Sequence, residues 1–202
     1  MSIHILHANP MVAPRHLCDW DLPRAVEIAA RILSTVSASI RRPWLAELAD
    51  TALTQPLSHA EQGRLKQLRT FREHLPPLRE DSPLVVWAGE SWYNWLWVHH
   101  YGRTAAIEYL VRFGEDPEGF AELHQIGEMG LSPEVKGQAK FAHWYRDARL
   151  GQEWLPQRFR LLPANAAQAV QAHREYYYCS RRRRARWAGA VPDWWQRRAT
   201  AP

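Results

Sequence analysis

The spacing of apolar positions predicts helices along most of the chain. Between residues 22 and 36, apolar side chains recur at intervals of three and four, which is typical of a helix with one buried face. Asp21 is placed to cap this helix, and Pro23 is tolerated in its first turn. The apolar run 3–6 predicts a short strand or an extended arm ahead of the helix.

Boundary signals divide the rest of the chain into further helices. A short helix is expected over 43–49, opened by Pro43. Ser58 and Glu61 have the spacing of a capping box, which predicts a helix that ends before the Pro-Pro pair at 76–77. We interpret the polar stretch 45–80 as a helical insertion that protrudes from the body.

Three pairs of a polar residue and a proline predict further helix starts: Ser82–Pro83, Asp116–Pro117 and Ser132–Pro133. The first of these helices is expected to run to residue 100 or 101, break at Gly102 and continue to about Phe113. The third is expected to end near residue 150, and a last helix is expected over 163–187. Strand signals are nearly absent, so we predict an all-α, single-domain helical bundle over residues 1–202, closed by a basic helix and tail at 170–202.

Composition argues against several classes of protein, including disulfide-rich, membrane and secreted proteins. Apolar residues make up 46% of the 202, which is enough for a core. Cys18 and Cys179 are too few for a disulfide scaffold or a four-thiolate zinc site. No apolar run approaches the ~20 residues that cross a bilayer, and the first residues lack the layout of a secretory signal. We therefore expect a cytoplasmic protein with no membrane partner.

Two biases favour nucleic acid as a partner. The chain has 23 arginines against three lysines, and arginine binds phosphate in a bidentate manner. It also has 11 tryptophans, whose flat faces fill cores and stack on bases. Residues 170–202 carry a net charge of +6, whereas the other residues sum to −1.

The segment from Cys18 to Arg24 is the first candidate site. Asp19 and Asp21 stand two apart at a predicted helix start, and Arg24 follows, so that their side chains can face one pocket. A carboxylate there can act as a general base, and the arginine can bind an anion. The alternative is that Asp21 caps the helix and Asp19 forms a turn.

Two further candidates lie on the next predicted helices. Trp87, Ser91, Asn94 and Trp95 share one helical face, which is usual for a core. A buried Asn94, however, needs hydrogen-bond partners, and the edge of a nucleobase offers them. Glu108 and Arg112 stand four residues apart, as a pair for chemistry or as a surface ion pair worth ~0.3–0.5 kcal/mol.

The basic C-terminal block is the fourth candidate. On a helix, Arg174, Tyr177, Arg181 and Arg184 share one face, while Arg182 and Arg183 lie elsewhere around the cylinder, and Trp187 follows. Such a helix fits phosphate contacts together with base stacking. The alternative is a solvated, charged helix end that the helix dipole stabilises.

Motifs for several enzyme classes are missing. The sequence has no HExxH, CxxC, GxGxxG, Walker loop or GxSxG, so nothing supports a nucleotide kinase, a Rossmann enzyme or a serine hydrolase. The ten histidines are scattered, and no metal site is predicted.

Taken in order, the four blocks resemble a family of small helical proteins encoded by tailed bacteriophages. The residues that carry the resemblance are Leu17-Cys18-Asp19-Trp20-Asp21 with Leu33-Ser34-Thr35; Pro83, Trp87-Ala88, Ser91 and Asn94; Glu108-Tyr109 and Arg112-Phe113-Gly114; and Arg174-Glu175-Tyr176-Tyr177, Arg182, Trp187, Pro192 and Trp194. The resemblance covers most of the chain apart from 40–80 and 116–160. Leu17, Trp20 and Asp21 depart from the pattern, which has His, Lys and His there, and His16 stands one place away.

The family is that of the amino acid:DNA transferases, or α-glutamyl/putrescinyl-thymine pyrophosphorylases, which hypermodify thymine. The resemblance implies that the partner is double-stranded DNA in which 5-hydroxymethyluracil carries a pyrophosphate ester. A free amino acid or amine then displaces the pyrophosphate. It also implies work inside an infected bacterial host.

This reaction implies a role for each candidate residue. Trp87, Ser91, Asn94, Trp95 and Tyr177 would receive a flipped base. Arg24, Arg112, Arg174 and Arg182 would stabilise the departing pyrophosphate, with no cofactor or with Mg²⁺ as an aid. Asp19 first, Glu108 second, and Asp21 beside them would take the proton of the amine. Arg181, Arg182, Arg183, Arg184 and Trp187 would hold the DNA.

Two other readings stay open. The loss of the family's Lys and His favours a non-catalytic protein that binds DNA or a host component. A base-flipping DNA glycosylase also uses an aspartate, and it would leave abasic sites rather than enlarged thymines.

Overall fold

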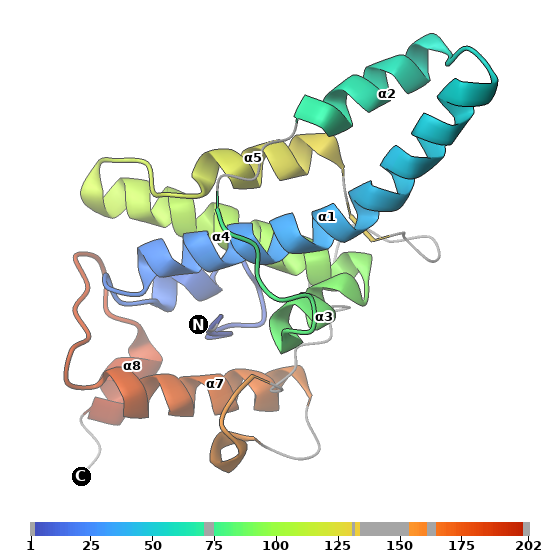
Figure 1. The fold of residues 1–202 in the computed structure, drawn as a ribbon. Helices are drawn as coiled ribbons and strands as arrows, with labels where there is room; N and C mark the ends of the chain where they lie inside the picture. Colours follow the sequence, from blue (N-terminus) through green and yellow to red (C-terminus); the bar gives the residue numbers. More distant parts are fainter. Residues whose placement is uncertain (1–2, 71–74, 131, 134–153, 161–164, 200–202) are drawn as a thin grey trace.

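The protein is built from helices around one long central helix (Figure 1). The computed structural model describes residues 3–70, 75–130, 132–133, 154–160 and 165–199. Within these ranges there are helices and no strand, which confirms the all-α prediction. The run 3–6 is therefore an extended segment.

The central helix is α1, Leu22–Thr54. Its apolar positions between 22 and 36 are buried, as the spacing predicts, and they form the middle of the core. The prediction of a separate helix beginning at Pro43 is wrong, because α1 continues through that residue. Proline cannot donate a hydrogen bond to the carbonyl four residues earlier, but the loss of one bond does not end a helix that is otherwise bonded. In Figure 1 the second half of α1 turns away from the body.

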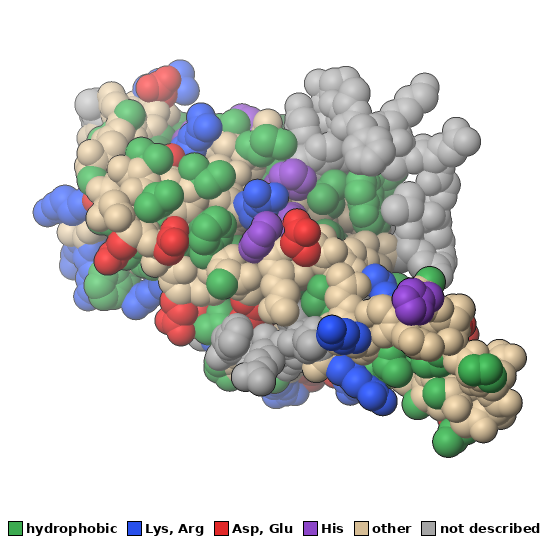
Figure 2. Space-filling view, turned by 90° about the horizontal axis from the view of Figure 1, so that it is seen from above, with side chains coloured by type: hydrophobic (Ala, Val, Ile, Leu, Met, Phe, Trp, Pro, Cys, Tyr) green, Lys and Arg blue, Asp and Glu red, His purple; other side chains and the backbone are tan. Residues whose placement is uncertain are grey.

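That second half pairs with α2, His59–Thr70, to form a helical hairpin, here called the arm (residues 44–70). The predicted capping box is confirmed: the Ser58 N–H donates to the Glu61 carboxylate at 2.7 Å, and the Glu61 N–H donates to Ser58 Oγ at 3.3 Å. The arm projects from the body in Figure 1, and in Figure 2 it extends to the lower right. Most of its side chains are exposed, so it adds little to the core.

Helices α3, Pro83–Gly89, and α4, Trp92–Phe113, replace the single helix expected after Ser82. The break comes at 90–91 instead of residue 102. It occurs there because Ser91 is extended and its Oγ accepts from the Asn94 N–H, which caps a new helix. The predicted end near Phe113 is confirmed, and Gly114 closes it with φ +77°.

Gly102 lies inside α4, so the predicted break there is wrong. Its role is close packing: a Cβ added at this position would stand 2.8 Å from the Ala29 Cβ of α1 and 2.9 Å from a Leu123 methyl of α5. The missing side chain therefore lets three helices meet.

Helix α5, Phe120–Met129, packs on α1 and α4. The start predicted at Asp116–Pro117 is wrong by a few residues, because the chain makes a turn there and the helix begins after Gly119, which has φ +86°. The helix predicted after Ser132–Pro133 falls on residues 134–153, which lie outside the described residues.

Residues 3–18 are here together called the extended segment after their first part, 3–6; bends and a turn follow at 7–12, and then comes the 3-10 turn η1, Ala13–His16. Ile3, Ile5 and Leu6 are fully buried. The segment has no strand beside it in the described structure, and side chains supply donors to its carbonyls instead: Trp154 Nε1 to Ile3 at 2.9 Å, Trp97 Nε1 to Ala8 at 2.8 Å, and Arg174 Nε to Leu6 at 2.9 Å.

The C-terminal part packs against this segment from below in Figure 1. After the 3-10 turn η3, Gln157–Phe159, helix α7, Ala166–Arg181, begins with a capping box between Asn165 and Gln168. The prediction that this helix continues to Trp187 is wrong. It ends at Arg181, and α8, Asp193–Ala199, returns across it.

We expect Gly102→Ala to destabilise the fold by about 1–3 kcal/mol, because the new methyl has no room between α1 and α5. Gly63→Ala is the matched control. Gly63 sits in α2 with nothing within 4 Å of an added Cβ, so helix propensity should raise stability by up to about 1 kcal/mol. Urea denaturation of both variants measures the difference, and equal effects would contradict the packing role.

Candidate functional site

Two cavities adjoin between the start of α1 and the end of α7. The first has a volume of about 490 Å³ and is lined by His4, Leu17, Asp21, Arg24, Ala25, Glu27, Ile28, Tyr101, Tyr176 and Arg181. The second, of about 610 Å³, is lined by Cys18, Trp20, Arg24, Cys179, Ser180 and Arg181–Arg184. Arg24 and Arg181 line both, so the two cavities are neighbours that share a wall, and together they are here called the cleft.

Asp21 and Arg181 join the two sides of the cleft. Arg181 Nε and Nη2 donate to the two oxygens of Asp21 at 2.7 and 3.0 Å, and Asp21 is only 5% exposed. Burial alone would raise the pKa of Asp21, but hydrogen bonds from Arg181 outweigh it and hold the pKa below its ordinary value. Asp21 is the residue before α1, as predicted, but it makes no side-chain cap, because its carboxylate is engaged by Arg181.

The inner wall of the cleft is aromatic. The His4 ring lies 4.8 Å from Tyr177 and 5.8 Å from Tyr176, measured between ring centroids. Burial lowers the pKa of His4 to about 4, so that the ring is neutral at pH 7, and its Nδ1 has no hydrogen-bond partner in the described structure. Burial and the charge of Asp21 raise the pKa of Tyr177 well above its usual value, and the Tyr177 hydroxyl accepts from the Cys18 N–H at 2.8 Å.

The arginine run forms the outer rim. Because α7 ends at Arg181, residues 182–184 lie in a turn and not around a helical cylinder, which corrects the expected geometry. All three are exposed, and the Arg184 N–H donates to the Arg181 carbonyl. The turn places these guanidinium groups at the mouth of the cleft. Trp187 is apart from them: it is half-buried, with its ring 4.9 Å from Trp195.

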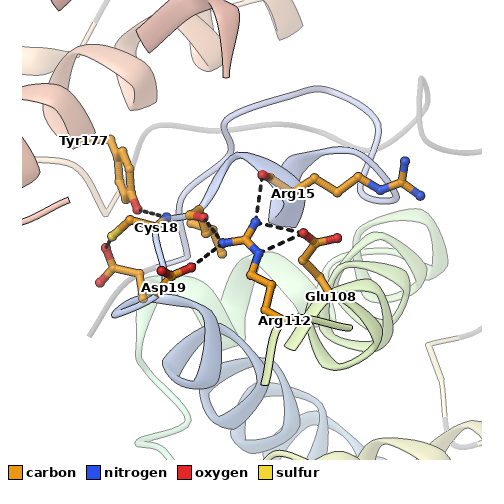
Figure 3. A network of polar contacts seen from close by, with 8 residues as sticks. Arg15, Cys18, Asp19, Glu108, Arg112 and Tyr177 are labelled. Carbon is orange, nitrogen blue, oxygen red and sulfur yellow. Dashed lines mark hydrogen bonds and ion pairs between the residues drawn. The ribbon is translucent and has the colours of Figure 1, made fainter. Parts of the chain in front are cut away.

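A second network lies beside the cleft and centres on Arg112 (Figure 3). Its side chain is 3% exposed. Arg112 Nη1 donates to the Asp19 carboxylate at 2.9 Å and to the Leu17 carbonyl at 3.0 Å, while Nε donates to Glu108 at 2.9 Å and Nη2 to the Arg15 carbonyl at 3.2 Å. This residue therefore fixes the loop that carries Asp19, and the Glu108 pair is part of the network and not an isolated surface pair.

The structure brings some predicted residues together and separates others. Asp21, Arg24 and Arg181–Arg184 meet in the cleft, with Tyr177 behind its wall. Asp19, Glu108 and Arg112 lie in the neighbouring network and line neither of its cavities. Arg174 faces a separate hollow of about 280 Å³ beside α8, where its guanidinium stands 5.3 Å from the Trp194 ring centroid.

The expectation of a tryptophan-walled base pocket is corrected by the structure. Trp87, Asn94 and Trp95 are core residues, and Asn94 is fully buried with its Nδ2 donating to the Trp87 carbonyl at 2.8 Å. Ser91 is the cap of α4. These four residues line neither cavity of the cleft.

Sequence reasoning gave no site role to His4, Tyr101 and Tyr176, the three aromatic rings that line the first cavity. His4 interrupts an otherwise apolar run, which was a usable signal. Tyr101 comes from α4, and no local pattern connects that helix to residues 4 and 176.

Comparisons with models of protein families, with curated proteins and with solved structures find no match to this chain. In the described ranges, no group of three or more His, Cys, Asp or Glu is placed to hold a metal ion. None of the helices described is both long and apolar enough to cross a membrane.

We expect stability to fall as the pH drops from about 6.5 to about 4. Burial lowers the pKa of His4, His16 and His99 to about 4, so the unfolded chain binds protons in this range that the folded chain excludes. The free energy of unfolding should decrease by at least about 1 kcal/mol per pH unit. Urea denaturation at pH 7, 6 and 5 measures it, with His59→Gln on the exposed start of α2 as the control that keeps the slope. Equal stability at pH 7 and 5 would contradict the burial of neutral histidines.

We expect Arg112→Met to lower the free energy of unfolding by about 2–3 kcal/mol, because it leaves two partly buried carboxylates without a counter-charge. The control is Arg79→Met, which removes an exposed pair with Asp81 and should leave the urea midpoint unchanged. If both variants behave alike, Arg112 does not hold the loop.

Proposed function

We propose that this protein is a DNA-modifying transferase that replaces the pyrophosphate of activated 5-hydroxymethyluracil with an amino acid or amine. The observation that carries the proposal is the cleft, where five arginines surround a cavity whose inner end holds a buried carboxylate and aromatic rings. The resemblance of the sequence to the phage amino acid:DNA transferases supplies the reaction.

The rim fits the DNA backbone. Arg182, Arg183 and Arg184 are exposed on a turn, where their guanidinium groups can bind successive phosphates. The charges of the rim are not cancelled nearby, because the acidic lining residues of the cleft, Asp21 and Glu27, already pair with Arg181 and Arg31.

The first cavity fits the base. Its volume of about 490 Å³ lies within the range of small-molecule sites. A base flipped out of the duplex can lie against Tyr176 and His4, whose ring is neutral at pH 7. These rings take the role that the sequence assigned to Trp87 and Trp95.

The transfer step needs groups that stabilise the leaving pyrophosphate and a group that accepts the proton of the amine. As the bond from the exocyclic carbon to oxygen breaks, pyrophosphate leaves with the electron pair, and we assign the stabilisation of its charge to Arg24 and Arg181, which line both cavities. The amine nitrogen forms the new bond to carbon and gives up one proton. The amine enters in its neutral form, and Asp21, which is ionised at neutral pH, accepts the proton that the nitrogen releases after the bond forms and passes it to solvent. We therefore assign this role to Asp21 rather than to Asp19, which Arg112 holds outside the cleft.

We expect Asp21→Asn to abolish product while DNA binding remains. The substrate is DNA whose 5-hydroxymethyluracil carries the pyrophosphate, incubated with the protein and free amino acids, and mass spectrometry of the released nucleosides detects the product. Asp81→Asn, at an exposed carboxylate that lines neither cavity, is the control that keeps full turnover. Full turnover by Asp21→Asn would remove that residue from the mechanism. DNA binding without product from the wild-type chain would identify a non-catalytic binding protein instead, and abasic sites would identify a glycosylase.

Replacing Arg182, Arg183 and Arg184 with Gln should weaken DNA binding and flatten its salt dependence, by about 0.9 in the logarithmic slope for each phosphate that the variant no longer neutralises. A second triple variant at Arg69, Arg79 and Arg103, exposed residues elsewhere on the body and arm, changes the net charge equally. Titrations at several salt concentrations should show a normal slope for this control. Equal slopes for both variants would place the DNA-binding surface elsewhere.

A further inference from the structure

Trp20 is an exposed tryptophan that the transfer chemistry does not use. It is 59% exposed, whereas Trp87, Trp95, Trp97 and Trp195 are all buried in the core. When a partner covers a large apolar ring that is otherwise in water, the free energy of the system falls. The position of Trp20 just ahead of α1 is fixed by the Asp19 N–H, which donates to the Arg186 carbonyl at 2.8 Å, and by the Asp21 contacts.

The surroundings of Trp20 are positively charged. The Arg24 guanidinium lies over the ring, 4.5 Å from its centroid. Trp20 also lines the second cavity of the cleft with Arg182, Arg183 and Arg184. The ring is thus held from one side by a guanidinium group and stands among the groups proposed to bind phosphates.

We propose that Trp20 is a stacking platform for an unpaired base of a nucleic-acid strand, next to the base that enters the first cavity. This inference rests on the proposed function, from which it takes DNA as the partner. It adds that the DNA is locally single-stranded where it contacts Trp20. A flat aromatic ring beside a basic track is the arrangement that binds single strands, because every base has a face to stack while the backbone follows the charges.

A paired duplex fits this platform poorly. Its base faces are covered by their neighbours, so Trp20 could reach a face only where the stack is open. Extruding one base into the first cavity opens the stack at that point, and the adjacent base then has a free face. An acidic peptide would satisfy the arginines, but its carboxylates offer the ring no flat face, whereas every nucleotide carries both a phosphate and a base.

The test compares two probes with the same phosphates, a labelled oligothymidine of about 12 nucleotides and an abasic strand of equal length. Fluorescence anisotropy at one fixed salt concentration measures the affinity of the full chain for each. We expect Trp20→Ala to weaken binding of oligothymidine by at least about fivefold, the loss typical of one stacked base, and to leave binding of the abasic strand unchanged. Trp20→Phe should retain most of the affinity.

Trp44→Ala is the matched control. Trp44 also lies under a guanidinium group, that of Arg64 at 4.9 Å, but it belongs to the arm and not to the cleft. It should bind both probes as the wild type does. Circular dichroism checks that each variant keeps its helices.

Each outcome decides the inference. Equal affinity of wild type and Trp20→Ala for oligothymidine overturns it and leaves the proposed function standing. An equal loss for both probes overturns it too, because Trp20 would then only position the arginines. A wild-type chain that binds neither probe nor duplex DNA defeats the proposed function itself. Polyglutamate that competes as well as oligothymidine, and loses affinity equally in Trp20→Ala, would identify an acidic protein as the partner instead.

Discussion

The extended segment 3–18 runs through the core without a strand beside it in the described structure, and this imposes one demand on the rest of the molecule. Its buried carbonyls need donors, and in the absence of a sheet these come from local turns and from side chains. The side-chain donors come from residues far along the chain: Trp97 and Arg112 on α4, Trp154 before η3, and Arg174 on α7. Part of the tryptophan and arginine content is therefore structural, since these residues reach across the core and end in an N–H group.

The hydrogen bonds that satisfy this segment also determine where the cleft lies. Arg174 and Tyr177 dock α7 on the extended segment, and four residues beyond Tyr177 the helix presents Arg181 to Asp21, 160 positions earlier in the chain. The bidentate pair lies at the last residue of α7, directly before the arginine turn. A charged group at the buried end of the cleft is tolerated because its partner neutralises it. The rim stays positive because its own arginines face solvent.

Local signals in the sequence predict the features that depend on short-range interactions, above all the helix boundaries. The start of α1, the capping box at Ser58 and the end of α4 follow from short-range hydrogen bonds and φ preferences, and the structure has them all. Gly102 is misleading because packing between helices outweighs the propensity of one residue, and Pro43 because the loss of one hydrogen bond does not end a long helix. In the site, Asp21 and the arginine run were found from their charge, whereas His4, Tyr101 and Tyr176 meet only through the path of the extended segment. The tryptophan-rich helix was assigned to the cleft because an amphipathic face does not reveal which neighbour covers it.

The passage of α1 through Pro43 joins two regions of different character in one helix. Before that residue its side chains are mostly buried, whereas beyond it most face water. Amide protons in the first half can therefore exchange with solvent only when the whole domain opens, while those of the arm exchange through local fraying that leaves the cleft intact. A single continuous helix thus joins a buried half and an exposed half, and the last buried residue before the change is Ser37.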